Sequence, residues 1–304
     1  MIDKIEITTK EFIKWESNKK IQDIRRTGQD HYKGHIKNIE ISQNLDGCLL
    51  KGSIAKYLNG QNIQPLERKE VEQALLFLQQ DTGLDFSKAV IRCVEIGTSI
   101  KLQNPVIEYL QCFDCIDNLK YKFQPCRTCN GLESLLYFTK TGAFEFSCYN
   151  KIQEMKDTRQ AIPESYKDRN VIRLELRIKK RQALRRIFKK DLKPLDLSDN
   201  VIFYELKNQF SKFYKQIPKI KRTVYLDMSK DITPKEILEA SAEAYRQEHS
   251  KELADIMQAG KDKGFISATT YKRIRAKNRQ NQAFSEKNGL IFELDDLLHL
   301  QGLY

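Results

Sequence analysis

The nine residues VIRLELRIK, from Val171 to Lys179, constrain the fold of this chain more than any other segment. From Ile172 to Lys179 the side chains alternate between apolar and charged, which is typical of a β-strand with two different faces. One face carries Ile172, Leu174, Leu176 and Ile178, and the other carries Val171, Arg173, Glu175, Arg177 and Lys179. The apolar face predicts packing on a core, and the charged face predicts exposure, with cross-strand ion pairs as the simplest use of its charges.

Other segments predict the rest of the fold. Alternation and apolar runs indicate strands within residues 1–60, at 89–97, and at 135–140 and 143–149 on either side of a turn at Thr141-Gly142. Residues 67–80 carry apolar side chains at helical spacing and are followed by Gly83, a residue suited to a helix end. Beyond residue 180 the chain becomes helical and basic. We therefore expect an α+β fold, with a central antiparallel sheet in a core domain at 1–217 and a helical region at 218–304.

The charge balance points to a polyanionic partner. The 304 residues include 53 Lys and Arg against 41 Asp and Glu, a formal net charge of +12. Such an excess suits the release of counterions from nucleic-acid phosphates, although a merely basic protein has the same composition. No run of about 18 apolar residues exists, so we expect no membrane partner. The N-terminal segment MIDKIEITTKEF lacks an apolar signal core, which predicts that the chain is not exported.

Two pairs of cysteines predict a metal. Cys112, Cys115, Cys126 and Cys129 form Cys-x2-Cys, ten residues, then Cys-x2-Cys. Four thiolates in this pattern match the tetrahedral preference of Zn²⁺, and a closed four-sulfur site is structural. We expect a zinc module inserted at about 110–132, the alternative being four reduced cysteines in a loop. Its aromatic residues either stack on unpaired bases or form a miniature core.

A tyrosine and three carboxylates suggest phosphodiester chemistry. Glu95, Glu154 and Glu175 lie on or just beyond separate strands and could converge on Mg²⁺ or Mn²⁺, which prefer oxygen ligands. Tyr149, at the end of the strand 143–149, would supply a nucleophile, and Lys151 would offset developing charge. The alternative is that the three carboxylates are ordinary ion-pair partners.

The order of these segments resembles the replication initiators of filamentous phages, the gene II and gene X type proteins, with related plasmid and prophage initiators. The likeness covers roughly residues 30–195, and its most specific parts are KGSIAKYLNGQN and NVIRLELRIKKR, with DHYKGH upstream. It implies a nuclease-like core that nicks one DNA strand at an origin, becomes linked to the 5′-phosphate and later rejoins the strand in rolling-circle replication.

The resemblance assigns roles by position. Tyr149 matches the nucleophile, Lys151 and Glu154 match the Lys and Glu after it, Glu95 stands at an aspartate position, and Glu175 matches the glutamate of the R-x-E-x-R strand. Two departures are visible: Cys93 stands where the phage pattern has Arg, and the segment KKRQALRRIF lacks the tyrosine that plasmid relatives carry there. Tyr204 is the second candidate nucleophile. No His-x-His pair is present, so a carboxylate site, with His31 as a ligand or a structural residue, is the remaining option.

Basic residues near the site and in the tail are candidates for DNA contacts. The set is Arg173, Arg177, Lys179, Arg181, Arg185, Arg273, Arg275 and Lys277. Those of the tail follow a helix and a glycine-bearing turn, which favours a helix-turn-helix-like reader as much as a structural bundle.

The sequence thus predicts a metal-dependent, site-specific DNA endonuclease and strand transferase acting in a bacterial cytoplasm. Its expected cofactors are Mg²⁺ or Mn²⁺ for catalysis and Zn²⁺ for structure, and its expected partners are origin DNA with a host helicase and polymerase. A non-catalytic origin-binding initiator or repressor is the main alternative. A zinc-stabilised nucleic-acid-binding module of another kind is the third.

Overall fold

The computed structural model describes residues 1–113, 121–128, 131–217 and 289–303, together with a few residues between 258 and 272. The chain divides into two compact units. The first comprises Met1–Leu110, Cys115–Pro218 and Asp296–Tyr304, and the second comprises Gln111–Asp114 and Lys219–Asp295. The sheet and the candidate site belong to the first unit.

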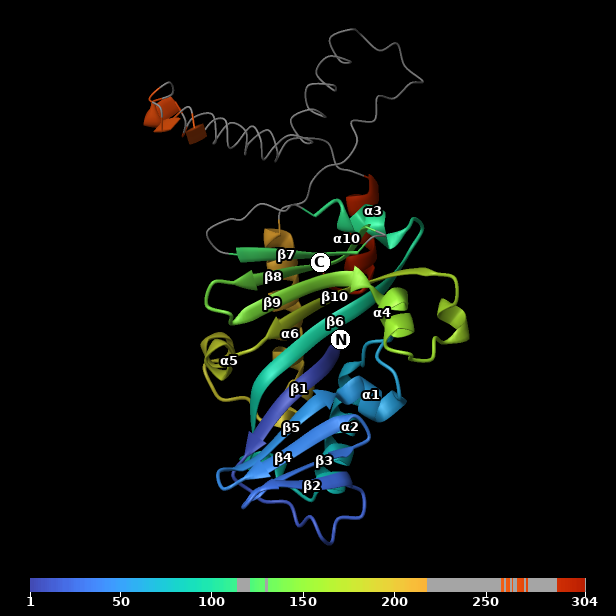
Figure 1. Ribbon diagram of the computed structural model, residues 1–304, viewed down its shortest axis with the longest axis vertical. Helices are drawn as coiled ribbons and strands as arrows, with labels where there is room; N and C mark the ends of the chain where they lie inside the picture. Colours follow the sequence, from blue (N-terminus) through green and yellow to red (C-terminus); the bar gives the residue numbers. More distant parts are fainter. Residues whose placement is uncertain are drawn as a thin grey trace. The chain divides into compact units, whose positions relative to one another are not determined.

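Within the described residues, ten strands form one antiparallel sheet in the order β2-β3-β4-β5-β1-β6-β10-β9-β8-β7 (Figure 1). The strands are β1 (Ile2–Thr9), β2 (Gln22–Gly28), β3 (His31–Ile36), β4 (Ile39–Asn44), β5 (Gly47–Ser53), β6 (Val90–Leu102), β7 (Tyr121–Thr128), β8 (Gly131–Thr139), β9 (Phe144–Asn150) and β10 (Asn170–Ile178). The predicted α+β class and antiparallel sheet are therefore confirmed.

The sheet consists of two halves with the same connectivity. The first half starts with β1 and continues into the meander β2–β5, whose last strand returns to pair with β1. The second half starts with β6 and continues into β7–β10, whose last strand returns to pair with β6. The strands β1 and β6 pair with each other, so the two halves meet at the centre of the sheet.

Helices flank the sheet on both faces. They are α1 (Ile54–Asn59), α2 (Arg68–Thr82), α3 (Val106–Leu110), α4 (Lys151–Asp157), α5 (Arg181–Phe188), α6 (Asn200–Gln216) and α10 (Gly289–Leu300), with short 3₁₀ turns η1 (Phe86–Lys88), η2 (Glu164–Tyr166) and η3 (Pro194–Ser198). The helix α6 lies behind the second half in the view of Figure 1, where its aromatic rings pack on Phe146 of β9. The helix predicted at 67–80 is α2, and Gly83 ends it with a φ of 71°. No helix in the described part is both long and apolar enough to cross a bilayer.

The strand predicted at 171–179 is β10, but its charged face is not simply exposed. Leu174 and Leu176 point to the helical side, as their alternation predicts, whereas Arg173 and Glu175 on the other face are also buried. The start of α4 and the loop at Ile63 cover the first part of that face, at Val171. Toward the end of the predicted strand, Arg177 is partly exposed and Lys179 is exposed. The expectation of a solvent-facing charged row is therefore wrong for the first part of the strand.

The segment predicted as a zinc module contributes backbone to the main sheet. Its residues Tyr121–Thr128 form β7, the last strand at one edge, and Gly131 begins β8. Cys115 and Cys129 lie outside the described residues, as does the side chain of Cys126, while Cys112 is buried. The zinc site stays a prediction.

Candidate active site

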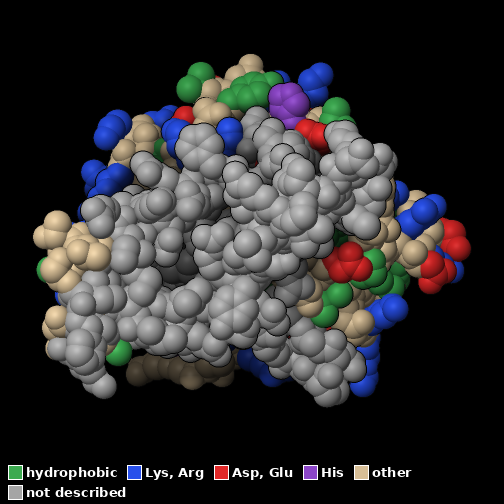
Figure 2. All heavy atoms as spheres, turned by 90° about the horizontal axis from the view of Figure 1, so that it is seen from above, with side chains coloured by type: hydrophobic (Ala, Val, Ile, Leu, Met, Phe, Trp, Pro, Cys, Tyr) green, Lys and Arg blue, Asp and Glu red, His purple; other side chains and the backbone are tan. Residues whose placement is uncertain are grey.

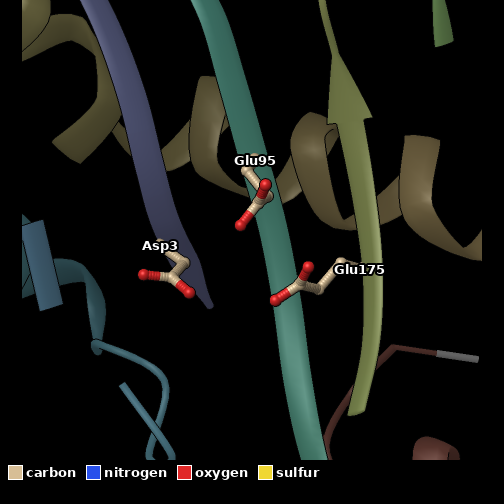
Figure 3. A group of neighbouring side chains, drawn as sticks. All are labelled: Asp3, Glu95 and Glu175. Atoms are coloured by element: carbon tan, nitrogen blue, oxygen red, sulfur yellow. The ribbon is translucent and has the colours of Figure 1, made fainter. Parts of the chain in front are cut away.

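Three carboxylates from the three central strands converge on the face of the sheet that the large helices leave open. Asp3 comes from β1, Glu95 from β6 and Glu175 from β10, and their side chains point toward one another (Figure 3). Each offers an oxygen within 4.8 Å of an oxygen from the others. All three are buried, Glu95 completely. Carboxylates that come this close out of water repel each other, so the protein has to supply positive charge.

Arg173 supplies much of that charge. Its guanidinium is completely buried, with Nη2 2.8 Å from Oδ2 of Asp3 and Nε 3.1 Å from Oε1 of Glu175. Nη1 donates to the carbonyl oxygen of Asn62 and to Oγ of Ser99. The guanidinium lies against Gly97, where a Cβ would stand 2.7 Å from Nη2, so this position needs a residue without a side chain.

Asp3 is held as an anion. Burial alone would raise its pKa, but the charge of Arg173 and the hydroxyl of Ser53 outweigh burial and lower the pKa below its ordinary value. The amide of Asn62 also donates to Oδ2 of Asp3, at 2.7 Å. Asp3 therefore accepts hydrogen bonds from three side chains, all of them buried.

The negative charge of Glu95 is compensated less completely than that of Asp3. Burial raises its pKa first, and the nearby charge of Glu175 raises it further, despite Lys4 and Arg177. Arg177 pairs with Oε2, whereas Oε1 accepts no hydrogen bond from the described residues and has the Nζ of Lys4 3.1 Å away, outside hydrogen-bond geometry. This buried oxygen is the place in the cluster where a further cation would be most favourable.

Tyr149, the predicted nucleophile, joins this cluster. Its register on β9 places it opposite Arg173 of β10, and its hydroxyl donates to Oε1 of Glu175 at 2.9 Å. Burial raises the pKa of the hydroxyl, and the charge of Glu175 raises it further. The hydroxyl is therefore protonated here, with a carboxylate in position to accept the proton.

Lys151 and Glu154 form a neighbouring pair. Both belong to α4, which Asn150 caps by accepting a hydrogen bond from the backbone of Gln153. The buried Nζ of Lys151 lies 2.7 Å from Oε2 of Glu154 and donates to Oδ1 of Asn62 at 3.1 Å. Of the predicted metal ligands, the structure brings Glu95 and Glu175 together with Asp3, while Glu154 pairs with Lys151.

The sequence reasoning missed three residues of the site, Asp3, Ser53 and Asn62. Ser53 and Asn62 are the third and last residues of KGSIAKYLNGQN, the motif noted for its resemblance to phage initiators. Ser53 caps α1 and also contacts Asp3, while Gly60 ends α1 with a φ of 75° and the chain returns at Asn62. The sequence offered one indication for Asp3. It is a carboxylate two and four residues before Ile5 and Ile7, which are buried in the same strand.

The other candidates for the chemistry lie elsewhere. His31 is on β3, which β4 and β5 separate from β1, and three strand spacings amount to about 14 Å. It therefore lies too far away to share a metal with Asp3. Tyr204 is exposed on α6, the helix that packs on the opposite face of the sheet from Glu175. Of the two candidate tyrosines, Tyr149 alone belongs to the cluster.

The predicted DNA contacts separate into groups. Arg173 is a correction, because its completely buried guanidinium is bonded to Asp3 and Glu175 and has no surface to offer a phosphate. Arg177 and Lys179 share Glu145, while Arg181 and Arg185 share Asp191. Arg273, Arg275 and Lys277 lie outside the described residues. Lys and Arg side chains are visible on several sides of the described surface in Figure 2, as the net charge requires.

Comparison with known proteins gives one match. The family model that describes the N-terminal part of the replication-associated gene II protein matches residues 3–194. The matched range begins at Asp3 and includes every residue of the cluster described above. No curated protein matches the chain.

Proposed function

Because the chain belongs to the family of replication-associated gene II proteins, whose role is in initiating rolling-circle replication, we propose that it nicks and rejoins one strand of DNA at an origin, with Tyr149 as the nucleophile. The observation that carries this proposal is the 2.9 Å hydrogen bond from the Tyr149 hydroxyl to Glu175, inside a buried cluster of three carboxylates. A tyrosine needs a neighbouring base to become a nucleophile, and Glu175 is in the position of that base.

In the proposed reaction the oxygen of Tyr149 attacks the phosphorus of the scissile phosphodiester. A bond forms between that oxygen and phosphorus, the bond from phosphorus to the 3′-oxygen breaks, and the tyrosyl proton passes to Glu175. The 3′-oxygen leaves as a hydroxyl after taking a proton from solvent, and the 5′-phosphate stays on the tyrosine. Rejoining reverses these steps. Lys151 is buried and bound to Glu154 and Asn62, so we assign it to positioning α4 and the end of β9.

The donor set of the cluster fits a divalent cation such as Mg²⁺ or Mn²⁺. Asp3, Glu95 and Glu175 would hold it, because they supply carboxylate oxygens that are close together and Oε1 of Glu95 lacks a hydrogen bond. Asp3 thus takes the place that the sequence assigned to Glu154. When bound, such a cation would stabilise negative charge on the phosphate. Lys4 is the cation closest to Oε1 of Glu95, and its side chain is 42% exposed, so it is free to move away.

A structural Zn²⁺ on Cys112, Cys115, Cys126 and Cys129 remains part of the proposal, on the strength of their spacing alone. Its test is the zinc content of the purified protein. We expect one equivalent, which the change Cys126→Ser would remove. A host helicase and polymerase are proposed as partners only because a replication initiator requires them.

One observation favours the alternative of an origin-binding initiator that does not cleave. The three carboxylates already have three cationic partners, Lys4, Arg173 and Arg177, so the cluster is neutral without a metal. A buried ion-pair network of this kind needs no catalytic role. Origin binding would then remain and cleavage would be absent.

A nicking assay separates the two functions. Supercoiled DNA that carries the cognate origin would be incubated with the protein and Mg²⁺ or Mn²⁺, and then with EDTA, and the covalent adduct identified by mass spectrometry. We expect the wild type to nick, Tyr149→Phe to lose nicking by at least about 10³-fold, as for loss of a nucleophile, and Tyr204→Phe to match the wild type. An adduct on another tyrosine would overturn the assignment, and tight origin binding without any nick would favour the non-catalytic initiator.

A further inference from the structure

A basic hollow lies on the same face of the sheet as the candidate active site. It has a volume of about 690 Å³, and five of its lining side chains are cationic: Arg92, Lys179, Lys180, Arg181 and Arg185. The described residues put no carboxylate in its lining. Glu145 pairs with Lys179, and Asp191 pairs with Arg181 and Arg185, so about three positive charges remain uncompensated around it.

Arg92 is the cation most available for a ligand. It is exposed, and within the described part of the chain no carboxylate lies within ion-pair distance of it. It occupies an irregularity in the pairing of β1 with β6, where Glu6 pairs with Cys93 and Ile7 pairs with Ile91. An extra residue in one strand of a pair changes the direction in which a side chain points. Here the extra residue directs the exposed side chain of Arg92 away from the core.

The hollow continues the row of side chains that carries the catalytic groups. Glu175 and Arg177 of β10 and Lys179, which follows the last residue of β10, lie in one row on the same face, as the shared contact of Arg177 and Lys179 with Glu145 of β9 indicates. Lys179 is four residues from Glu175, which corresponds to about 13 Å along a strand. A phosphate in the hollow would thus lie about 13 Å from a phosphate at Tyr149.

The other end of that row is closed. Ile152 and Met155 of α4, with Ile63 and Tyr166, pack on Val171 at the start of β10. Figure 1 shows α4 and α5 at opposite ends of β9 and β10. Along β10, the open face therefore extends from the site only toward Arg177, the hollow and α5.

We propose that this hollow binds backbone phosphates of the DNA that flanks the nick, within a few nucleotides of the reacting phosphate. That the ligand is DNA rests on the proposed function, whereas the position of the site rests on the residues that line the hollow. Its contacts go to phosphates, so they contribute affinity and register and no sequence preference. Arg92 and Lys180 thereby gain a role that the sequence did not assign to them.

The test compares two double variants that lose the same charge. Arg92→Gln with Lys180→Gln removes two cations of the hollow, and Lys14→Gln with Lys19→Gln removes two exposed cations that do not line it. The probe is a fluorescein-labelled duplex of arbitrary sequence, bound by the full chain in EDTA at a series of NaCl concentrations. Circular dichroism before binding checks that each variant is folded.

We expect the hollow variant to bind roughly tenfold or more weakly at 0.1 M salt, with a slope of log K against log[salt] smaller by about 1.8, because each phosphate contact contributes about 0.9. The control variant should keep the wild-type slope. An unchanged hollow variant, or an equal loss in the control, would overturn the proposal. If the wild type nicks DNA but the hollow variant and the control variant have the same slope, the proposed phosphate site is wrong and the proposed function stands. If no nicking occurs but the slopes differ as expected, the phosphate site is supported and the nicking function is not.

Discussion

The two halves of the sheet share a connectivity but not a chemistry. In each half a central strand is followed by a four-stranded meander whose last strand returns beside it. On the open face, the returning strand of the first half presents Leu49 and Lys51, whereas that of the second half presents Arg173 and Glu175. The returning strands are therefore equivalent in the fold, and only one of them carries buried charge.

This difference teaches where a site can form in such a sheet. The second half contributes Tyr149, Glu95 and Glu175, and the first half contributes Asp3 and the amide of Asn62. Neither half contains the whole cluster, which exists only where β1, β6 and β10 lie side by side. The following changes test that dependence, beginning with the largest expected effect.

Removing the buried cation Arg173 from the second half should destabilise the protein far more than removing the exposed cation Lys51 from the first half. Arg173→Met leaves two buried carboxylates without their partner and should lower the free energy of unfolding by about 3–5 kcal/mol. Lys51→Met removes an exposed side chain and should change it by no more than about 0.5 kcal/mol. Denaturant unfolding of the full chain measures both. Equal losses in the two variants would mean that Arg173 is not the centre of the network.

The carboxylates from the two halves should respond to pH with opposite signs. The pKa of Asp3 is lowered by folding, so its contribution is present above the unfolded pKa and is lost as pH falls through the folded one. The pKa of Glu95 is raised, so its ionisation costs stability as pH rises above the unfolded value.

At pH 7, Asp3→Asn should therefore lower the free energy of unfolding by about 3 kcal/mol, because it leaves Arg173 underpaired. The free energy of unfolding of the Glu95→Gln variant should equal or exceed that of the wild type at pH 7. The Glu95→Gln difference should shrink as pH falls toward 4, whereas the Asp3→Asn difference should persist to about pH 4 and shrink only below it, because the folded pKa of Asp3 is lowered. Unfolding measured between pH 2 and pH 8 checks both. A loss on Glu95→Gln that grows with pH would contradict this account.

Binding of Mn²⁺ should need both halves. Asp3→Asn and Glu95→Gln should each weaken Mn²⁺ binding by roughly tenfold or more, since even partners outside the ligand set have effects of that size. Glu154→Gln, whose carboxylate pairs with Lys151, should change it little. Calorimetric titration without DNA gives this readout independently of cleavage. A larger loss on Glu154→Gln than on Asp3→Asn would restore the ligand set inferred from the sequence.

The last comparison concerns two helix caps, one in each half. Ser53 caps α1 and also contacts Asp3, while Asn150 caps α4 alone. Asn150→Ala should cost about 1 kcal/mol of unfolding free energy, and Ser53→Ala about 2 kcal/mol. In the Asp3→Asn background the excess cost of Ser53→Ala should fall. Additive losses would show that the contact of Ser53 with Asp3 contributes nothing.

The sequence predicted the elements well because their patterns are local. The alternation of 171–179 and the helical spacing of 67–80 each correspond to an element in the structure. The exposure predicted for the charged face was wrong because burial of Arg173 depends on β1, β6 and the loop at Asn62, which are distant in the sequence.

The site was predicted in part for the same reason. Tyr149, Glu95 and Glu175 stood out through their strands, but Asp3 joins them only through the pairing of β1 with β6. The pairing of Lys151 with Glu154 could have been anticipated, because residues three apart on a helix are neighbours. Which carboxylates share a site depends on strand order, which a single sequence does not specify.

The hydrogen bond between Tyr149 and Glu175 has a consequence for the lifetime of a covalent intermediate. If Tyr149 carries the 5′-phosphate, its oxygen no longer has a proton to donate, and an ionised Glu175 would stand beside a phosphate anion. The two negative charges would repel each other, and the hydrogen bond that holds the free tyrosine in place would be lost. The geometry would therefore disfavour the covalent intermediate relative to the free tyrosine, and it would favour early rejoining of the strand over a long-lived attachment.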